Sequence, residues 1–444
     1  MASEKRGRES REASPAQSFT RREFLRITTA SGAAGGLTGF LPTAARAQKT
    51  GRAIKLGYVS PQTGPLAGFG EADTFVVGGV RKAFAKGLRV GDTVHPIEIL
   101  IRDSQSDPNR AAEVASRLIL SDKVDLMLVA STPETTNPVS DQCEVNGTPC
   151  ISTVAPWQPW FFGRNGKPET GFRSTYHFFW GLEDIIAVFI DMWNSLDTNK
   201  VVGALWPNDG DGIAWSDAKR GFPPALAAAG YKVIDPGRFP NLSDDFSAQI
   251  SAFKAAKVEI VTGVPLPPDF TTFWKQAAQQ GFRPKIASVG KALLFPRSVE
   301  ALGDIGDGLS TEVWWSPSHP FSSSLTGISA AGLAHDYTKE TKKQWTQPIG
   351  FIHALFEVAA DVLKRAGSID DKSAIAAAIK GANLKTIVGP ISWARGPVPN
   401  VAKTPLVGGQ WGKGAGFRFD VTIVTNKTAP QIPTAGKLRP IRSA

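Results

Sequence analysis

The sequence has little of the material from which disulfide frameworks and metal centres are built. It contains two cysteines and five histidines among 444 residues. Two cysteines exclude a disulfide-rich scaffold and a four-cysteine zinc site, and so few histidines make a metal centre unexpected. No stretch reaches about 18 consecutive apolar residues, so we expect no membrane-spanning helix.

The signatures of common enzyme classes are also missing. The chain holds no Gly-x-Ser-x-Gly elbow, no His-Glu-x-x-His pair and no phosphate-binding loop. Gly68-Phe69-Gly70 followed by Asp73 matches half of a dinucleotide fingerprint, but its third glycine is absent, so we interpret it as a turn. His177 and His353 lie among apolar residues and are expected to be packed. We therefore predict a protein that is not an enzyme, with no cofactor and no metal.

Composition and charge are those of an ordinary globular chain. Apolar residues make up 42%, charged residues 20%, and the formal net charge is +10. The length allows two or three domains. No basic block is interleaved with aromatics, so nucleic acid is not an expected partner.

Residues 1–47 have the layout of an export signal. The run Thr20-Arg21-Arg22-Glu23-Phe24-Leu25-Arg26 precedes a short stretch rich in Gly and Ala, and Ala45-Arg46-Ala47 offers small residues to a signal peptidase. The paired arginines indicate the twin-arginine type, and Gln48, not Cys, follows the cleavage site, so we expect no lipid anchor. The prediction is a soluble periplasmic protein, and the alternative is a basic tail without a signal function.

Apolar, strand-like stretches alternate with amphipathic, helix-like ones. The predicted strands are 54–59, 97–101, 124–129, 149–153, 201–206, 258–264 and 285–289. Helices are expected at 71–86 and from Asp107-Pro108 onward, where Asp is the N-cap and Pro opens the first turn. Strands separated by helices imply an α/β fold with parallel sheets, and two such runs predict two lobes. Ligands in such sheets bind beyond the carboxyl ends of the strands.

Two loops at those ends, and one aromatic segment, are candidates for a ligand site. Ser60–Gly70 is rich in Gly and Pro, and Ser131–Thr136 places hydroxyls at a helix N-terminus, where they suit a carboxylate or serve as simple caps. Nine of the 24 residues from Trp157 to Trp180 are aromatic. We expect most of these to pack, and two or three to wall a cleft.

Six segments, in order, resemble motifs of type I periplasmic binding proteins of the branched-chain amino-acid (Leu/Ile/Val-binding-like) ABC transporter family. They are Ile54–Glu71, Arg102–Pro108, Asp141–Ser152, Pro207–Gly212, Gln276–Phe282 and Thr386–Trp393. The resemblance implies a two-lobed clamshell, each lobe a doubly wound parallel sheet, with three crossing segments. It also implies a small-molecule ligand in the cleft, closure by a hinge, a monomer, and delivery to an ABC permease of the inner membrane.

This resemblance also implies a division of the chain. The expected parts are 1–47 as signal, 48–175 and 316–394 as lobe 1, 176–315 as lobe 2, and 395–444 as the hinge return with the C-terminal part of lobe 2. The crossing segments are expected near 172–176, 314–318 and 395–416.

The family's ligand positions transfer unevenly onto this sequence. The aromatic of the first loop matches Phe69, and the hydroxyl loop that grips a carboxylate matches Ser131 and Thr132. The loop after the fourth strand is Thr153-Val-Ala-Pro-Trp157, in which Ala155 keeps its place while Pro156 and Trp157 replace the usual Thr. Further candidates are Trp180 from the aromatic segment, Asp209 from the Asn-Asp-x-x-Gly turn, and Leu266 from the loop after the strand ending at Val264.

The expected ligand follows from two charged positions. Glu183 matches the acidic residue that binds an amino group, whereas Lys291 stands where an amino-acid binder often has an acid. Lys291 suits a carboxylate or carbonyl, or is a solvated surface lysine. We expect an aromatic acid or amide-like solute; the alternatives are a branched-chain or other amino acid, favoured if Glu183 faces the cleft, and a sensor of a signalling system.

The two cysteines, Cys143 and Cys150, flank a predicted helix-turn-strand unit. We predict a disulfide between them, which the periplasm permits; two buried free thiols are the alternative.

Overall fold

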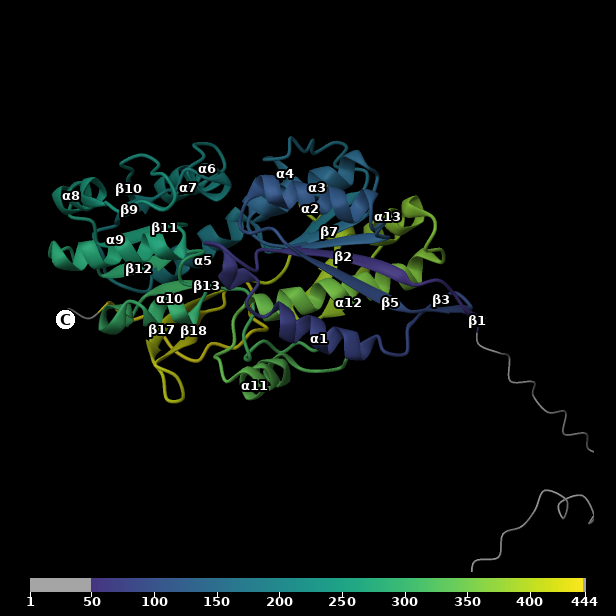
Figure 1. Cartoon of the computed structure of the whole chain (residues 1–444). Coiled ribbons are helices and arrows are strands. Elements are labelled where there is room, and N and C mark those ends of the chain that lie inside the picture. Colours follow the sequence, from purple (N-terminus) through teal and green to yellow (C-terminus); the bar gives the residue numbers. More distant parts are fainter. Residues whose placement is uncertain (1–48, 442–444) are drawn as a thin grey trace, which may run out of the picture. The chain divides into compact units, whose positions relative to one another are not determined.

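Two separate β-sheets organise the residues that the structure, a computed structural model, describes, 49–441 (Figure 1). The export signal predicted for residues 1–47 lies outside the described residues. Within 49–441, no helix is both long and apolar enough to cross a membrane. The predicted α/β class is confirmed, and the sheets define a first and a second lobe.

The sheet of the first lobe has six parallel strands. In spatial order they are β16 (Val401–Ala402), β8 (Thr175–Phe178), β7 (Cys150–Thr153), β6 (Leu126–Ala130), β2 (Ile54–Ser60) and β5 (Ile97–Asp103). Four of them are strands predicted from the apolar pattern. Side chains alternate between the two faces of a strand, and both faces of this sheet are covered. Leu126 and Leu128 of β6 pack in one core, and Met127 and Val129 in another.

Helices cover each face of the first sheet. α1 (Asp73–Ala83) and α12 (Pro348–Ala366) share the core of Leu126 and Leu128, whereas α2 (Pro108–Leu120) and α3 (Pro133–Val145) share that of Met127 and Val129. The predicted start of α2 is confirmed: the Asp107 carboxylate accepts a hydrogen bond from the Arg110 N–H at 2.7 Å. α13 (Lys372–Lys380), α11 (Ala330–Thr341) and the short α4 (Trp157–Phe161) complete the helices that accompany this sheet.

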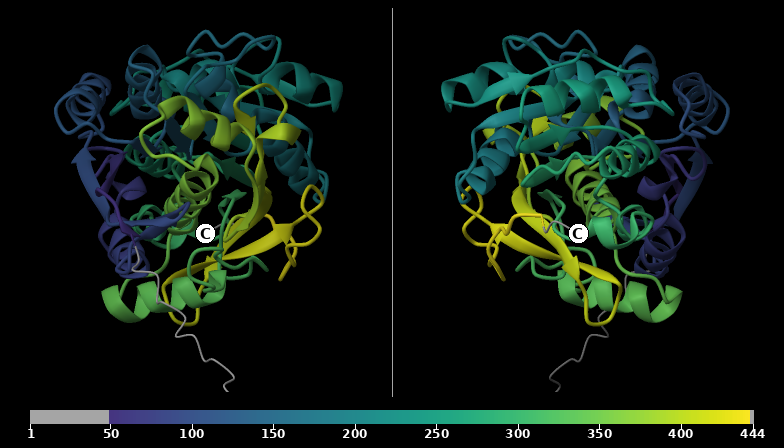
Figure 2. Two further views of the ribbon diagram at one scale, coloured as in Figure 1. Left: turned by 90° about the vertical axis from the view of Figure 1, so that its right-hand side faces the viewer. Right: turned by 90° about the vertical axis from the view of Figure 1, so that its left-hand side faces the viewer.

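The sheet of the second lobe has seven strands. In spatial order they are β10 (Lys232–Ile234), β9 (Val201–Leu205), β11 (Ile260–Gly263), β12 (Ile286–Val289), β13 (Ser310–Val313), β17 (Val407–Lys413) and β18 (Phe419–Thr425). The first five are parallel, and β17 and β18 are antiparallel additions at one edge. Figure 2 shows these two C-terminal strands, in yellow, from both ends of the molecule. The expected parallel sheet is therefore found in β9–β13. A C-terminal antiparallel hairpin, β17 and β18, extends this sheet.

Helices also cover both faces of the second sheet. α8 (Ser247–Ala255) and α9 (Pro267–Gln279) pack in one core, and α5 (Leu182–Trp193) and α7 (Phe222–Ala228) pack in the other. The short α6 (Gly210–Trp215) and α10 (Pro296–Glu300) follow β9 and β12. Smaller elements are the strands β1 (Lys49–Thr50), β3 (Leu88–Val90), β4 (Thr93–His95), β14 (Asn383–Thr386) and β15 (Gly389–Ser392), and the 3₁₀ turns Ala67–Phe69, Gly303–Gly306 and Trp393–Arg395.

The chain passes between the two sheets three times. It leaves the first sheet after β8 through 179–181, returns after β13 through a segment that begins at Trp314, and crosses again through 403–406 between β16 and β17. The first crossing lies later than the predicted 172–176, because Thr175–Phe178 pairs with β7 and β16 in the first sheet. For the same reason, the boundary predicted after residue 175 falls inside β8.

The order of the strands indicates where a ligand binds. In the first sheet β5 and β6 lie on opposite sides of β2, and in the second sheet β10 and β11 lie on opposite sides of β9. Loops that leave such neighbouring strands in opposite directions open a crevice at the carboxyl ends. The crevice loops are those after β2 and β6 in the first lobe, and those after β9 and β11 in the second.

Candidate ligand-binding site

A small cavity lies where these carboxyl-end loops of the two lobes meet. Its volume is about 20 Å³, enough for about one water molecule. The first lobe contributes Phe69, Thr132, Val154 and Pro156; the crossing segments contribute Phe179, Trp180 and Trp314; the second lobe contributes Asp211, Trp215, Val264, Lys291, Leu294 and Glu312. The cavity is therefore walled by aromatic rings and contains four polar or charged side chains besides the indoles.

Four hydrogen-bond donors at this cavity have no partner among the described residues. They are the indole N–H groups of Trp180, Trp215 and Trp314 and the hydroxyl of Thr132, and all four atoms are buried. A buried donor without a partner costs about 1–3 kcal/mol, so four at one place are not a neutral feature of packing. Their residues all line this cavity, and a ligand with acceptor atoms bound there would satisfy them.

Thr132 holds its place because a strand ends and a helix begins beside it. β6 stops at Ala130, and Thr132 is the N-cap residue of α3, although its side chain makes no capping hydrogen bond. The neighbouring Thr135 and Thr136 hydroxyls donate to the Ser131 hydroxyl and carbonyl, at 2.6 and 2.8 Å. Of this hydroxyl cluster, Thr132 is thus the member left for a ligand, next to the N-terminus of a 13-residue helix.

A buried group of charges borders the cavity on the side of the second lobe. The Lys291 ammonium lies 3.1 Å from an Asp209 carboxylate oxygen and 2.7 Å from an Asp211 oxygen, and all three side chains are only 3% exposed. Asp209 also caps α6, because its carboxylate accepts the Gly212 N–H at 2.8 Å. Oxygens of Glu134, Asp209 and Asp211 lie within 4.8 Å of one another. One ammonium therefore neutralises part of a trio of carboxylates.

Burial shifts the pKa values of this group. Desolvation raises the pKa of Asp211 to about 7, against the opposing effect of Lys291, and the carboxylates of Glu134 and Asp209 add to the rise. Burial also raises the pKa of Glu312 to about 7. The Glu312 carboxylate accepts a hydrogen bond from the backbone N–H of Lys291. For Lys291, burial alone would lower the pKa, but the surrounding carboxylates outweigh it and hold the pKa above its ordinary value. Lys291 is consequently charged throughout the physiological range.

The two lobes touch each other around the cavity. The Gly210 N–H of the second lobe donates to the Glu134 carboxylate of the first at 2.9 Å, and the Phe69 and Phe295 rings pack edge to face, with centroids 5.0 Å apart. Further contacts between lobes join Arg297 to Glu71 at 3.5 Å, and Arg220 to the Phe162 ring at 4.0 Å. The lobes are therefore in contact around the cavity, and its volume of about 20 Å³ is too small for an organic solute unless the lobes separate.

Four of the predicted site residues line the cavity: Phe69, Thr132, Trp180 and Lys291. Lys291 is not the solvated surface lysine of the alternative interpretation, since it is buried and paired with aspartates. The aromatic segment 157–180 was expected to place most of its rings in packing and two or three at the cleft. Phe179 and Trp180 reach the cavity, whereas Trp160 and Phe161 belong to a separate apolar cluster.

The other predicted residues do not line the cavity. They are Ser131, Thr153, Ala155, Trp157, Glu183, Asp209 and Leu266. Thr153 and Ala155 are used inside the first lobe: the Thr153 hydroxyl donates to the Phe178 carbonyl at 2.6 Å, and the Ala155 carbonyl lies 2.7 Å from His177 Nε2. Asp209 borders the site indirectly, through Lys291.

The Glu183 side chain is bonded to a residue of the first lobe and to a residue of the third crossing segment. Its carboxylate accepts the Trp157 indole N–H at 3.1 Å and the Lys403 ammonium at 2.7 Å. Burial raises the pKa of Glu183, but Lys403 and the indole N–H outweigh it and bring the pKa below its usual value. An acid already bonded by two donors is not free to hold the amino group of a ligand.

Several lining residues were not singled out from the sequence. Asp211, Trp215, Glu312 and Trp314 all carry polar atoms to the cavity. Asp211 lies in the Asp209-Gly-Asp-Gly212 turn, and the presence of a second acid in that turn is the sequence feature that could have identified it. Glu312 and Trp314 belong to β13 and its end, a strand that the apolar pattern did not reveal because its sequence is Ser-Thr-Glu-Val.

The predicted disulfide is not present: Cys143 of α3 and Cys150 of β7 are free thiols. Both are fully buried in the apolar core between α2, α3 and the first sheet. Buried cysteine behaves as a small apolar side chain, and here the two thiols fill a helix-sheet contact. Burial raises the pKa of Cys143 well above its ordinary value, so that thiol stays protonated.

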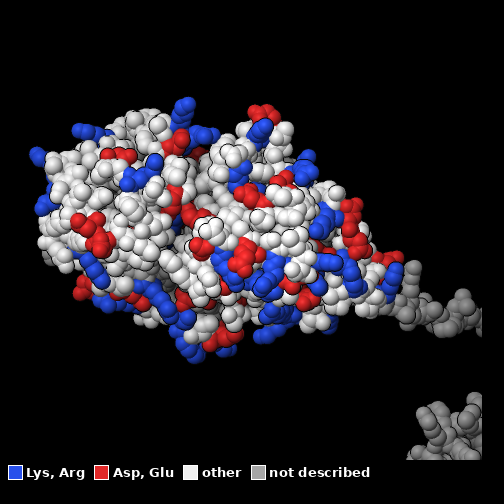
Figure 3. All heavy atoms as spheres, turned by 45° about the horizontal axis from the view of Figure 1, so that its top comes forward, with Lys and Arg blue, Asp and Glu red and all other residues white. Residues whose placement is uncertain are grey.

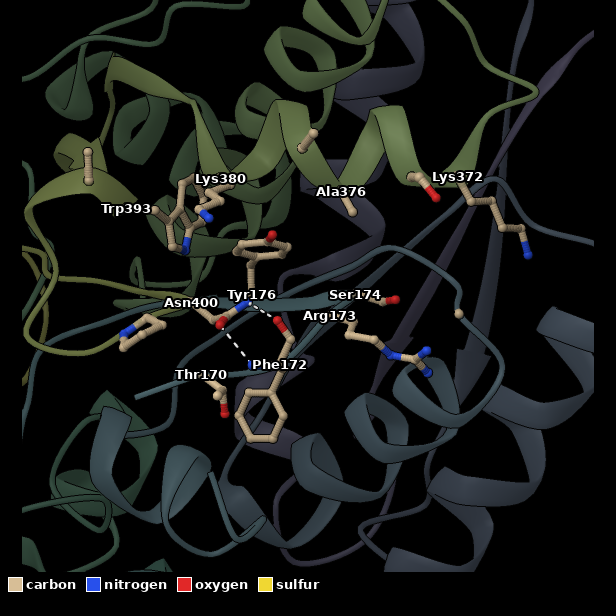
Figure 4. Close-up of a pocket in the computed structure, with 15 residues that line it drawn as sticks. Thr170, Phe172, Arg173, Ser174, Tyr176, Lys372, Ala376, Lys380, Trp393 and Asn400 are labelled. Atoms are coloured by element: carbon tan, nitrogen blue, oxygen red, sulfur yellow. Dashed lines mark hydrogen bonds between the residues drawn. The ribbon is translucent and has the colours of Figure 1, made fainter. Parts of the chain in front are cut away.

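A larger pocket, of about 570 Å³, lies elsewhere in the first lobe, between α13 and the start of β8 (Figure 4). Lys372, Lys380, Tyr176 and Trp393 contribute to its walls, and Asn400 is tied there to Phe172 by two hydrogen bonds. None of the unpartnered buried polar atoms of the described residues belongs to this pocket. The small cavity between the lobes is therefore the better candidate for a specific ligand site.

Charges of both signs occur on the surface. On the face drawn in Figure 3, basic and acidic side chains are interspersed, in keeping with the modest net charge.

Comparison with known proteins agrees with the fold. The family model described as periplasmic binding protein matches residues 53–415. The chain belongs to the periplasmic binding protein family, and it has the type I fold of two α/β lobes. The assignment to a family of binding proteins also agrees with the prediction of a chain that is not an enzyme.

Solved structures with the same fold have little sequence in common with this chain. A leucine binding protein from Thermotoga maritima is 21% identical, with a TM-score of 0.69, over 84% of this chain and 99% of that one. A branched-chain amino-acid binding protein from Streptococcus pneumoniae, in complex with isoleucine, is 15% identical, with a TM-score of 0.66, over 84% and 99%. A solute binding protein of an ABC transporter from Rhodopseudomonas palustris, in complex with 3,4-dihydroxybenzoic acid, is 19% identical, with a TM-score of 0.66, over 85% and 99%. At such identities the likeness shows the fold alone.

Proposed function

We propose that this protein is the periplasmic receptor of an ABC importer and binds a small organic solute, with an aromatic acid or amide-like compound favoured. In this proposal residues 1–47 direct export by the twin-arginine route, the mature protein acts as a monomer, and the partner is a permease in the inner membrane. The partner hydrolyses ATP, whereas this chain captures and presents the solute.

The observation that carries the ligand class is the set of unpartnered donors at the cavity. Three indole N–H groups and the Thr132 hydroxyl offer hydrogen bonds to acceptors, and the rings of Phe69, Phe179 and the three tryptophans offer flat apolar walls. A planar molecule with a carboxylate or carbonyl supplies both complements. The solute binding protein from Rhodopseudomonas palustris with its bound dihydroxybenzoic acid is a precedent in the same fold.

Binding would proceed by closure of the lobes. The solute meets the loops of one lobe first, and the second lobe then closes over it about the three crossing segments. Only interactions that are stronger in the closed form shift the population toward closure. The indole N–H groups of the crossing segments and the Thr132 hydroxyl of the first lobe are suited to this, because a solute can bridge them only when the lobes meet.

A branched-chain or other amino acid is the second candidate. The leucine and isoleucine binding proteins of the same fold favour it, as do the carboxyl groups of Asp211 and Glu312 at the cavity. Against it stands the bonding of Glu183 to Trp157 and Lys403. A receptor that reports the solute to a signalling system would use the same cleft; loss of solute uptake on deletion of the gene would separate transport from sensing.

The test is a thermal-shift screen of the mature protein, residues 48–444. The panel holds 3,4-dihydroxybenzoic acid, benzoic acid, benzamide, leucine, isoleucine and valine. A ligand present at 100 times its dissociation constant stabilises the native state by about 2.7 kcal/mol. A shift with the aromatic acids or the amide is the expected result. A shift with the amino acids alone would transfer the assignment to the second candidate.

A further inference from the structure

We infer that the Lys291 side chain is a built-in ammonium: it fills the cation-binding part of the cavity and so excludes solutes that carry a positive charge near the carboxylates. This inference rests on the proposed function, because it assigns the charge class of the solute for that same site. It makes Lys291 a specificity-determining residue and not a donor to the solute.

The geometry places the ammonium where a ligand's amino group would be bound. Lys291 and Asp211 both line the cavity, and the ammonium lies 2.7 Å from Asp211 and 3.1 Å from Asp209. An ammonium has three N–H donors, and these two carboxylates take up two of them. The remaining carboxylate of the trio, Glu134, stands within 4.8 Å of the other two.

The charge balance shows why this place attracts a cation. Without Lys291, the buried Asp209 and Asp211 and the half-buried Glu134 would bring three carboxyl groups into one small volume with no cation. Such a group is tolerable only if a cation joins it or if its members take up protons. The chain supplies the cation itself, at 4% exposure. A second ammonium, brought by a solute, would meet like charge at short range.

The backbone around Lys291 holds the side chain in this position. Lys291 has a φ of 55°, in the left-handed region that residues with a Cβ adopt uncommonly. Its N–H donates to the Glu312 carboxylate at 3.3 Å, which ties the turn after β12 to β13. A costly backbone conformation that is fixed by a buried hydrogen bond indicates a lysine whose position is determined by its surroundings.

Donors predominate among the unpartnered polar atoms of the lining residues, with Asp211 Oδ1 as the one acceptor. The Nε1 atoms of Trp180, Trp215 and Trp314 and the Thr132 hydroxyl are donors, and they call for acceptors. The site therefore combines a cation position that is already filled with donor positions that are open. Solutes with carboxylate or carbonyl groups and no amino group fit this combination, whereas zwitterionic amino acids do not.

The experiment removes the charge of Lys291 while keeping the length of its side chain. Lys291→Met and, as the matched control, Lys285→Met are compared with the wild type by thermal shift in the presence of butylamine and of leucine. Lys285 is half-exposed and pairs with Glu259 at the other end of the same strand. We expect butylamine to raise the melting temperature of Lys291→Met by at least about 2 °C, and to leave the wild type and Lys285→Met unchanged.

A second variant keeps the test decisive if Lys291→Met does not fold alone. The double variant Lys291→Met/Asp211→Asn removes one charge of each sign, so it relieves the excess of carboxylates while the ammonium position stays open. Refolding of Lys291→Met in butylamine, or an amine response of the double variant, supports the inference. The inference is overturned if neither variant responds to amines, whether folded or refolded, or if the wild type responds as strongly as they do.

The readouts separate this inference from the proposed function. The response of the wild type to benzoic acid, 3,4-dihydroxybenzoic acid and benzamide tests the solute class, and the amine response of the variants tests the role of Lys291. If the wild type ignores every acid and amide while Lys291→Met gains amine binding, the proposed solute class fails and the assignment of Lys291 stands.

Discussion

Glu134 and Gly210 join the two lobes by a hydrogen bond across the cleft: the Gly210 N–H donates to the Glu134 carboxylate at 2.9 Å. Glu134 lies in the first turn of α3 in the first lobe, and Gly210 begins α6 in the second. This bond exists only while the lobes touch, so it stabilises the closed form relative to the open one.

Glu134→Ala should therefore favour the open form. Loss of a hydrogen bond to a charged acceptor costs about 1.5–3 kcal/mol, and we expect affinity for the solute to fall about tenfold or more. Glu134→Gln, which retains an acceptor oxygen, should lose less. Small-angle X-ray scattering without solute should give a larger radius of gyration for the alanine variant.

Glu113→Ala, on the exposed face of α2, is the control for this prediction. Equal affinities for Glu134→Ala and the control would contradict the role of Glu134 in closure.

Trp314→Phe tests the open donors of the cavity. The substitution keeps an aromatic ring but removes the unpartnered indole N–H, and a hydrogen bond contributes about 0.5–1.5 kcal/mol. We expect solute affinity, measured by isothermal titration calorimetry, to fall roughly three- to tenfold.

Trp411→Phe is the matched control for that measurement. The Trp411 indole donates to the Leu293 carbonyl at 2.8 Å, and Trp411 does not line the cavity. Its variant should lose stability and keep its affinity. If both variants bind the solute as the wild type does, the indoles of the cavity are packing residues.

Stability should depend on pH through the buried acids of the cavity. The pKa of Asp211 and that of Glu312 are raised to about 7 by burial, whereas an unfolded chain releases these protons near pH 4. Raised native pKa values mean stability that is present at low pH and lost as the pH rises through about 7. The melting temperature should fall between pH 5.5 and pH 8.5.

Asp211→Asn should flatten this profile by roughly 2 °C or more, since the amide does not ionise and about 1 kcal/mol corresponds to such a shift. The slope that remains would come from other acids, such as Glu357, whose pKa burial also raises to about 7. Asp336→Asn, on the exposed side of α11, should leave the profile as it is. An unchanged slope in Asp211→Asn would rule out this carboxyl as a source.

The two cysteines should remain thiols in the purified protein. Both are buried in the native state, so alkylation without denaturant should be slow, and alkylation in guanidinium should label two sites by mass spectrometry. Dithiothreitol should leave the melting temperature unchanged. A mass two daltons below that of the reduced chain, with no labelling in denaturant, would restore the disulfide hypothesis.

Much of the fold was predictable because apolar stretches mark buried parallel strands. β2, β5 and β6 are rich in Ile, Leu and Val, and these three strands and β7 were all found close to their predicted positions. β13 escaped because a strand of Ser, Thr, Glu and Val has no such run. Its partner β17 carries three glycines and a glutamine, and its place between β13 and the edge strand β18 follows from tertiary pairing.

The site was predictable where local structure decides it. Phe69 and Thr132 follow strands whose ends the sequence marks, and both line the cavity. Glu183 was assigned by resemblance alone, and its carboxylate is taken by Lys403, 220 residues away along the chain. Lys291 was correctly expected at the site, but its predicted partner was a carboxylate or carbonyl of the ligand. Its partners are Asp209 and Asp211, which approach it only through the packing of the loops after β9 and β12. Pairings of this kind depend on contacts that a linear pattern does not encode.

The late strand β16 and helix α12 have a consequence for synthesis on the ribosome. The first lobe takes its edge strand from residues 401–402, and one face of its sheet is covered by residues 348–366. A nascent chain that has emerged only as far as β8 therefore carries five strands of this sheet, one face of which is covered by α1 but not yet by α12. The first lobe therefore cannot finish folding until nearly the whole polypeptide has left the exit tunnel.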